Sequence, residues 1–177
     1  MKEDDWFSEA VRFVYARGLF TGTDANTFNP KMPMTRAMLV TVLHRLAGSP
    51  AARGAMFDDV AEGKWYYDAV NWAAESGIVN GIGGNLFAPD VDITREQMAT
   101  ILYGYTNYMD IALPKKRNGV FIDDAEISDW ARDAVEAMFA AGIINGKPGN
   151  LFDPKATATR AEVAAMLHGF LQAIAGE

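Results

Sequence analysis

The chain has 177 residues, of which 50% are hydrophobic and 22% are charged, so it can bury a core and does not have the composition of a disordered segment. Its formal net charge of −7 argues against a general nucleic-acid binder, because neutralising phosphates requires a basic surface. It contains no cysteine, which excludes disulfides and thiolate metal sites, and its apolar runs are too short to insert into a membrane.

Three copies of one pattern run through the chain in the same register. In each copy a Thr-Arg pair follows a tryptophan, with the threonine 29 residues after it, and two glycines and a Phe-x-Pro segment lie between them at constant spacing. The aligned positions are Trp6, Trp65 and Trp130; Gly18, Gly77 and Gly142; Gly22, Gly81 and Gly146; Phe28, Phe87 and Phe152; Thr35, Thr94 and Thr159; and Arg36, Arg95 and Arg160. Such a repeat predicts three similar structural units, which we place at residues 1–50, 51–112 and 113–177.

Each copy is predicted to form a helix, a long loop and a second helix. Apolar residues of the first helix follow a period near 3.6, and the helix is expected to end at Gly18, Gly77 or Gly142, where glycine adopts a left-handed conformation at little cost. The loop, residues 19–34 in the first copy, is long for a compact domain, but its Phe and Pro predict an ordered loop packed on the core. The links at 47–56 and 106–120 are expected to be surface connections.

The second helix of each copy is expected to begin at the threonine. Apolar residues 4, 7, 8 and 11 positions later form a stripe on one side, which two helices alone cannot bury. We therefore predict an all-α fold in which three helix-loop-helix repeats close into a pseudo-threefold, three-pronged bundle. An open solenoid is the alternative, but neither end of the chain has the polar outer face of a capping repeat.

The residues at the start of each second helix predict a helix cap. Thr159 and Glu162 have the spacing of a capping box, Thr94 and Gln97 keep it, and Thr35 is followed by Met38, which cannot accept a hydrogen bond from the backbone. The threonine and the acid are therefore explained as structural support for the helix.

The arginine after each threonine is not needed for capping, and a cation at a helix N-terminus is mildly unfavourable. One interpretation places Arg36, Arg95 and Arg160 exposed and unpartnered, where each receives an anion together with free helix N–H groups. The other interpretation is a structural salt bridge to a carboxylate in a neighbouring copy. The residues alone leave both open.

Other aromatic and ring-bearing positions have structural explanations. His44 and His168 are equivalent, but Tyr103 replaces them in the second copy, which favours packing or groove lining over a metal site. The repeated tryptophans are expected to be buried, although they would also suit stacking on a sugar.

Nothing in the sequence predicts catalysis. The motifs of nucleophile elbows, zinc proteases, P-loops and dinucleotide sites are missing, and three near-equal sites do not suit a reaction that needs several different groups in one place. A glycan hydrolase would need two carboxylates beside one cleft, and Glu9, Asp68 and Asp133 offer no distinct pair. We expect no enzymatic activity, no cofactor and no metal.

The Trp-x-x-x-Ala-Val helix, the Gly-Ile-Ile-Asn-Gly run at 142–146, Phe-x-Pro and Thr-Arg-Ala-Glu at 159–162 together resemble a triplet of S-layer homology domains. The resemblance covers nearly the whole chain. It implies an extracellular module, a pseudo-trimer made by a single chain, that anchors bacterial surface proteins to the cell wall or S-layer.

The same resemblance implies a ligand and its contacts. The expected ligand is a secondary cell-wall polysaccharide, often capped by a pyruvate ketal, which lies in grooves between repeats. Arg36, Arg95 and Arg160 would receive its carboxylate, and Gly22, Gly81 and Gly146 would let the backbone approach it. A protein–protein or surface-assembly module that uses the same grooves is the alternative.

Departures from the family pattern also carry expectations. Met38 and Gln97 replace the signature glutamate, so the starts of those two helices are expected to be less rigid. The three grooves are not expected to bind equally. The family's Phe-x-Asp-Val lead-in occurs at 57–60 and, imperfectly, at 121–124, but has no room before Trp6. Residues 1–5 are acidic where a secretion signal is basic and then apolar. Together these features predict a piece of a longer exported protein.

Overall fold

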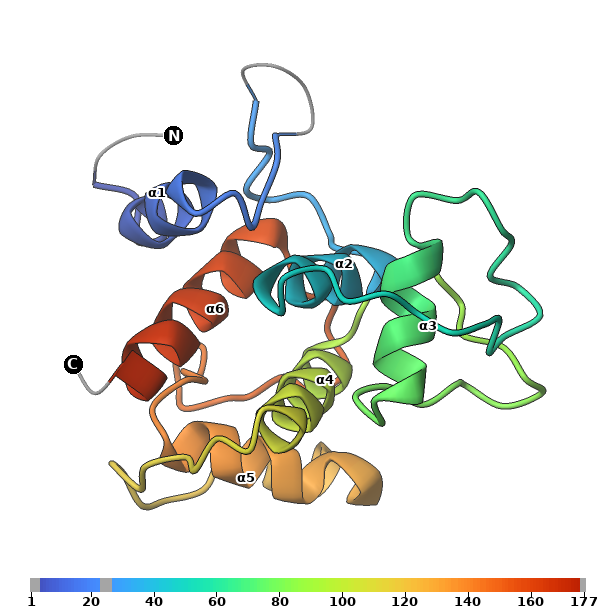
Figure 1. Ribbon diagram of the computed structural model, residues 1–177. Helices are drawn as coiled ribbons and strands as arrows, with labels where there is room; N and C mark the ends of the chain where they lie inside the picture. Colours follow the sequence, from blue (N-terminus) through green and yellow to red (C-terminus); the bar gives the residue numbers. More distant parts are fainter. Residues whose placement is uncertain (1–3, 23–26, 176–177) are drawn as a thin grey trace.

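The computed structural model describes residues 4–22 and 27–175, and within these residues the fold is all-α, as predicted (Figure 1). Three short helices, α1 (Ser8–Ala16), α3 (Tyr67–Glu75) and α5 (Arg132–Ala140), alternate with three longer ones, α2 (Arg36–Leu46), α4 (Arg95–Tyr108) and α6 (Arg160–Ala175). Two 3-10 turns, η1 (Asp124–Glu126) and η2 (Asp129–Ala131), precede α5. The predicted order of helix, loop and helix is present in each copy, although α4 extends into the segment predicted as a link.

The short helices end at the predicted glycines. Gly77 has a φ of 68°, and the N–H of the next residue, Ile78, donates to the carbonyl of Ala73 at 2.8 Å. This Schellman arrangement satisfies the last carbonyls of the helix and turns the chain sharply. Gly18 and Gly142 also have positive φ, and the apolar residue after each of the three glycines is buried. Each loop therefore starts packed against the core.

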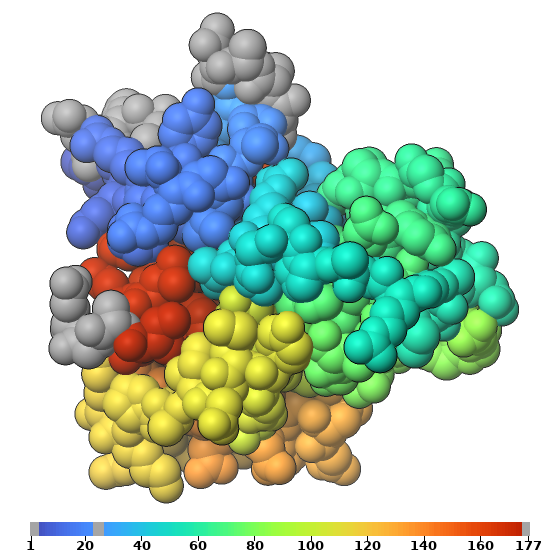
Figure 2. Space-filling model, in the orientation of Figure 1, coloured from blue at the N-terminus to red at the C-terminus, as the bar shows by residue number. Residues whose placement is uncertain are grey.

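Each short helix packs against the long helix of a different copy. Helix α3 contacts α2, α5 contacts α4, and α1 contacts α6. The last of these contacts joins the two ends of the chain, and Figure 2 shows the blue N-terminal segments beside the red C-terminal helix. In Figure 1 the long helices lie around the middle of the molecule with the short helices outside them.

Backbone segments of the three copies meet just before the long helices. The N–H of Met34 donates to Ala158 O at 2.9 Å, that of Ala158 to Ile93 O at 2.8 Å, and that of Ile93 to Met34 O at 2.8 Å. All three residues are buried. These hydrogen bonds run from copy to copy and return to the residue at which they began.

The Phe-x-Pro turns are held by aspartates from the lead-in segments. The two carboxylate oxygens of Asp59 accept from the N–H groups of Phe87 and Ala88, and those of Asp123 accept from Phe152 and Asp153. Phe87 and Phe152 are completely buried. The prediction of an ordered, packed loop is therefore confirmed in copies two and three; in copy one, residues 23–26 lie outside the described part of the chain.

Candidate functional site

Three surface grooves share one construction, and each contains residues from all three copies. An arginine comes from one copy, the glycine-containing loop and the long helix from the next, and a tryptophan from the remaining copy. Groove A is lined by Arg36, Gly81, Gln97 and Trp130; groove B by Arg95, Gly146, Glu162 and Trp6; groove C by Arg160, Gly22, Met38 and Trp65. Their volumes are about 470, 660 and 470 Å³.

The three arginines are buried, so the interpretation that places them exposed and unpartnered is wrong. Arg36, Arg95 and Arg160 are 5%, 4% and 6% exposed. In each, Nε donates to the carbonyl of the Phe-x-Pro phenylalanine in the next copy, and Nη2 donates to the residue before the groove glycine. The acceptors are Phe87 and Asn80 for Arg36, Phe152 and Asn145 for Arg95, and Phe28 and Thr21 for Arg160, at 2.7–3.3 Å. Each arginine therefore connects two copies.

The backbone N–H groups at the N-termini of the three long helices already have acceptors within the protein. In α2 the N–H of Arg36 donates to Val91 O and that of Ala37 to Pro89 O, both at 3.0 Å, while Thr35 Oγ1 accepts from Met38 N. Helices α4 and α6 repeat the arrangement with carbonyls at Ala156 and Pro154 and at Met32 and Pro30. The expected anion site on free helix N–H groups is therefore absent at these three termini, because the loop of the next copy supplies their acceptors.

The capping residues differ among the copies in the way the sequence suggests. Thr94 and Gln97 exchange two hydrogen bonds, and Glu162 Oε2 accepts from the N–H of Thr159 at 2.8 Å. Met38 returns no such bond to Thr35. Copy one thus keeps half of the capping box that the other two complete.

Glu162 has a second role in groove B. Its Oε1 lies 2.8 Å from Arg95 Nη1, and this pair is nearly enclosed, with side chains 19% and 5% exposed. In the part of the chain that the structure describes, neither Arg36 nor Arg160 forms a salt bridge. The interpretation as a salt bridge to a neighbouring copy therefore holds for one arginine of the three.

Burial changes the pKa of the two arginines that lack a salt bridge. It lowers the pKa of Arg36, an effect that the charge of Asp59 opposes, and it lowers the pKa of Arg160. Because a guanidinium keeps its proton in proteins, both side chains remain cations at neutral pH. They are charges partly removed from water without a paired carboxylate.

The repeated tryptophans are exposed, so the prediction that they are buried was wrong. Trp6, Trp65 and Trp130 are 69%, 59% and 57% exposed, and each lines one groove. The residue after each of them is buried instead, and Trp65 packs edge-on against the ring of Tyr66 at 5.1 Å between centroids. The spacing of Trp6 from Ala10 and Val14 continues the apolar period of the helix, which is why burial was expected. Each tryptophan, however, stands before its helix begins, so the helical period does not set the direction of its side chain.

The groove glycines make room for other parts of the protein. A Cβ on Gly81 would lie 2.6 Å from Leu86 O and 2.9 Å from Phe57 Cε1, and one on Gly146 would lie 2.9 Å from Phe121 Cε1. Neither has a positive φ, so a left-handed turn is not the reason for glycine. Close internal packing explains both, and Gly22 lines groove C.

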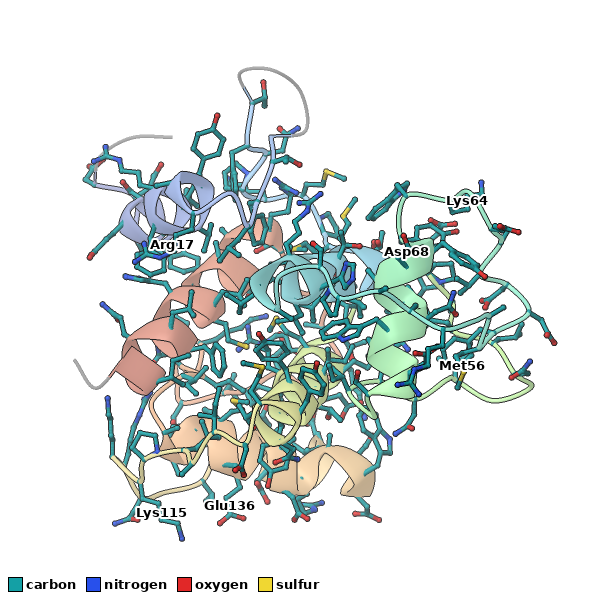
Figure 3. All side chains as sticks on the ribbon, in the orientation of Figure 1. Arg17, Met56, Lys64, Asp68, Lys115 and Glu136 are labelled. Carbon is teal, nitrogen blue, oxygen red and sulfur yellow. The ribbon has the colours of Figure 1, made fainter. Side chains whose placement is uncertain are left out.

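The remaining candidates contribute packing or lie elsewhere. His44 packs on Trp72 with centroids 5.2 Å apart, and His168 packs on Phe13 at 4.5 Å and lines groove B. Of the three carboxylates weighed for hydrolysis, Glu9 lines groove B, whereas Asp68 (Figure 3) and Asp133 are exposed outside the grooves described above.

The described residues contain no cluster of three or more His, Asp or Glu side chains arranged to hold a metal ion. Within the same residues, no helix combines the length and the apolar character that a membrane crossing requires.

Comparison with known proteins identifies the repeat. The family model of the S-layer homology domain matches residues 1–37, 57–99 and 121–164. The chain is 35% identical over 174 residues to an amylopullulanase of Thermoanaerobacterium thermosulfurigenes, covering 96% of this chain and 9% of that protein. It is 29% identical to the surface-layer 125 kDa protein of Lysinibacillus sphaericus, covering 93% of this chain and 14% of that one. It is 28% identical to a cellulosome-anchoring protein of Acetivibrio thermocellus, with 85% and 35% covered. The chain thus spans a minor part of each relative.

Proposed function

The chain belongs to the S-layer homology domain family, and on this premise we propose that it is a noncatalytic module that anchors a protein to an acidic glycan of the cell wall. Family membership makes it an extracellular, cell-wall-associated module. The activity named in the amylopullulanase belongs to a protein of which this chain matches 9%, so it is not carried over.

The proposed architecture is a pseudo-threefold, three-pronged bundle formed by a single chain, with copies at 1–50, 51–112 and 113–177. Two sets of contacts support it: α1 packs on α6, and each arginine donates to the loop of the following copy, with Arg160 returning to the first. The copy boundaries follow from the sequence repeat and stay a prediction, as does the monomeric state.

The proposed ligand is a cell-wall polysaccharide that carries a carboxylate, in particular a pyruvate ketal. The observation that supports it most is that each groove combines an arginine with an exposed tryptophan from a different copy. The indole face suits the apolar side of a sugar ring, and the guanidinium suits an acid on that ring. Gly22, Gly81 and Gly146 lie beside the arginines in the same grooves.

Energetics explain why three grooves serve an anchor better than one. A single charge-assisted hydrogen bond contributes about 1.5–3 kcal/mol, so one groove holds a sugar only modestly. When several grooves engage one polymer, effective concentration raises avidity by on the order of 10²–10⁴. The net charge of −7 does not prevent this, because salt screens it beyond roughly 8–10 Å.

Retention on purified walls tests this proposal. The full chain is incubated with walls that carry native glycan and with walls from which the pyruvate ketals have been removed by mild acid. Retention is expected to fall strongly on the stripped walls. Equal retention on both would reject the acidic ligand.

One observation favours the alternative, a protein–protein or surface-assembly module. The groove arginines are at most 6% exposed, so the groove walls offer less charge than a fully presented guanidinium would. Protease treatment of the walls separates the two functions. Glycan binding survives the treatment, whereas loss of retention would assign the grooves to a protein partner.

A further inference from the structure

One groove position differs among the copies and lines the same groove as the buried arginine of the preceding copy. It is the residue three places after the capping threonine: Met38 in groove C, Gln97 in groove A and Glu162 in groove B. We propose that this position decides which grooves accept an acid, so that grooves A and C bind an acidic sugar and groove B does not. The inference rests on the proposed function and adds which of the three grooves carry it out.

In groove B the arginine already has its counter-ion. Arg95 Nη1 bonds Glu162 Oε1 at 2.8 Å, and the other oxygen of Glu162 accepts from the N–H of Thr159. A ligand carboxylate would meet the negative charge of Glu162 or would have to displace it, which breaks both the ion pair and the helix cap. Glu9 adds a second carboxylate to the lining of this groove.

In grooves A and C the corresponding side chains carry no charge. Gln97 uses its Oε1 to accept from Thr94 N, and Met38 is apolar. Arg36 and Arg160 donate to backbone carbonyls through Nε and Nη2, while within the described residues their Nη1 atoms have no acceptor. Arg160 is a buried cation with no carboxylate acting on it, and Arg36 has only the charge of Asp59 nearby, with no ion pair. A buried cation without a paired carboxylate is costly, so a ligand carboxylate in these grooves would take the place that Glu162 has in groove B.

Groove C has a second arginine that the other two grooves lack, whereas the lysine that lines groove B, Lys147, is paired with Asp153. Arg45 is exposed and lines groove C, and its Nη1 donates to Leu19 O at 3.4 Å. Gly104 and Gly169 occupy the equivalent positions, and a Cβ on Gly104 would lie 2.6 Å from Ile78 O. Among the described lining residues of groove C there are two arginines and no carboxylate. Groove C is therefore expected to bind an acidic sugar more tightly than groove A does.

The chain contains its own reporters for each groove. Of its four tryptophans, Trp130 lines groove A, Trp6 groove B and Trp65 groove C, while Trp72 is buried in the core. Incorporating 5-fluorotryptophan gives each groove a separate ¹⁹F NMR signal, and the signal of Trp72 reports whether the fold is intact. The probe is a methyl hexoside that carries a 4,6-linked pyruvate ketal, and its neutral methyl ester is the matched control.

In the wild-type chain the acid probe is expected to bind more tightly than its ester at Trp65 and Trp130, by roughly tenfold or more. At Trp6 the two probes are expected to bind alike. Reciprocal substitutions then test the position itself. Glu162→Gln should give Trp6 a preference for the acid, and Gln97→Glu should remove that preference at Trp130.

These substitutions keep side-chain length and the cap, because Gln97 and Glu162 both accept from the threonine N–H. Met38→Glu is the third variant and should remove the acid preference at Trp65. An acid preference at Trp6 in the wild type, or preferences unchanged in all three variants, would overturn the inference while leaving glycan binding intact. If no exposed tryptophan responds to either probe, the proposed function fails as well.

Discussion

Arg160 and Thr21 are 139 residues apart in the sequence, yet Arg160 Nη2 donates a 2.8 Å hydrogen bond to the carbonyl of Thr21. The Nε of the same side chain donates to Phe28 O at 2.7 Å. The last long helix is thereby connected to the loop of the first copy. The arginine of the Thr-Arg pair thus holds copies together, whatever it binds in the groove.

Replacing this arginine is expected to destabilise the protein. Arg160→Met removes both donors and leaves the partly buried carbonyls of Thr21 and Phe28 without them, which costs about 1–3 kcal/mol of unfolding free energy. Urea unfolding monitored by circular dichroism measures the change. Lys115→Met, at an exposed lysine (Figure 3), is the control and should change stability by less than about 0.5 kcal/mol. Equal effects of the two substitutions would contradict a structural role for Arg160.

A methyl group at a groove glycine is also expected to destabilise. Gly81→Ala places a Cβ 2.6 Å from Leu86 O, and because that neighbour is backbone, the loop has to move, at a cost of about 1–3 kcal/mol. Thermal and urea unfolding give the value. Gly54→Ala is the matched control, because no atom lies within 4 Å of its added Cβ, and it should be neutral or slightly stabilising. If Gly81→Ala leaves the unfolding free energy unchanged, close packing is not the reason for glycine at this position, and the approach of a ligand is the remaining explanation.

Asp123 is expected to make stability depend on pH on the acid side. Burial opposes its ionisation, but backbone N–H groups of Phe152, Asp153 and Asp123 itself, together with the charge of Arg95, lower the pKa of Asp123 below its ordinary value. A carboxylate with a lowered pKa in the folded state stabilises the fold above its unfolded-state pKa of about 3.9. That contribution is lost as the pH falls through the folded-state pKa.

Urea unfolding between pH 7 and pH 2 tests this. Asp123→Asn should be less stable than the wild type at pH 7, and the difference should shrink below about pH 4. Asp68→Asn, at an exposed aspartate in the first turn of α3 (Figure 3), removes only a favourable interaction with the helix dipole and should cost less than about 1 kcal/mol at pH 7. A constant difference between Asp123→Asn and the wild type across the range would exclude the charge of Asp123 as the cause.

Trp65 is expected to matter for binding and little for stability. Its side chain is 59% exposed, so Trp65→Ala should change the unfolding free energy by less than about 1 kcal/mol. Loss of an aromatic contact of about 1 kcal/mol should weaken retention on native walls roughly fivefold. Tyr15→Ala removes a side chain that is 60% exposed and lies outside the grooves, and it should retain full binding. Unchanged retention of Trp65→Ala would remove groove C from the binding surface.

The repeat, the helices and their ends were predictable because their causes are local. The turn at Gly77 depends on the φ of one residue, and the cap at Thr94 depends on Gln97 three places later. The family resemblance rested on the same short segments, and the match at 1–37, 57–99 and 121–164 confirms it. Departures from the family pattern, such as Met38, were also visible in the sequence. Which arginine shares a groove with each of them was not.

The sequence by itself therefore determined three copies of two helices, where the short helices end and the long helices begin, and the residues that repeat. Only the tertiary structure decided that Arg36 is buried against Phe87, that Trp130 is exposed, and that a groove contains residues of all three copies. The physical reason is that identical local patterns leave open which copy packs on which. Burial and hydrogen-bond partners of a side chain at a copy boundary depend on that long-range choice, and no short stretch of sequence encodes it.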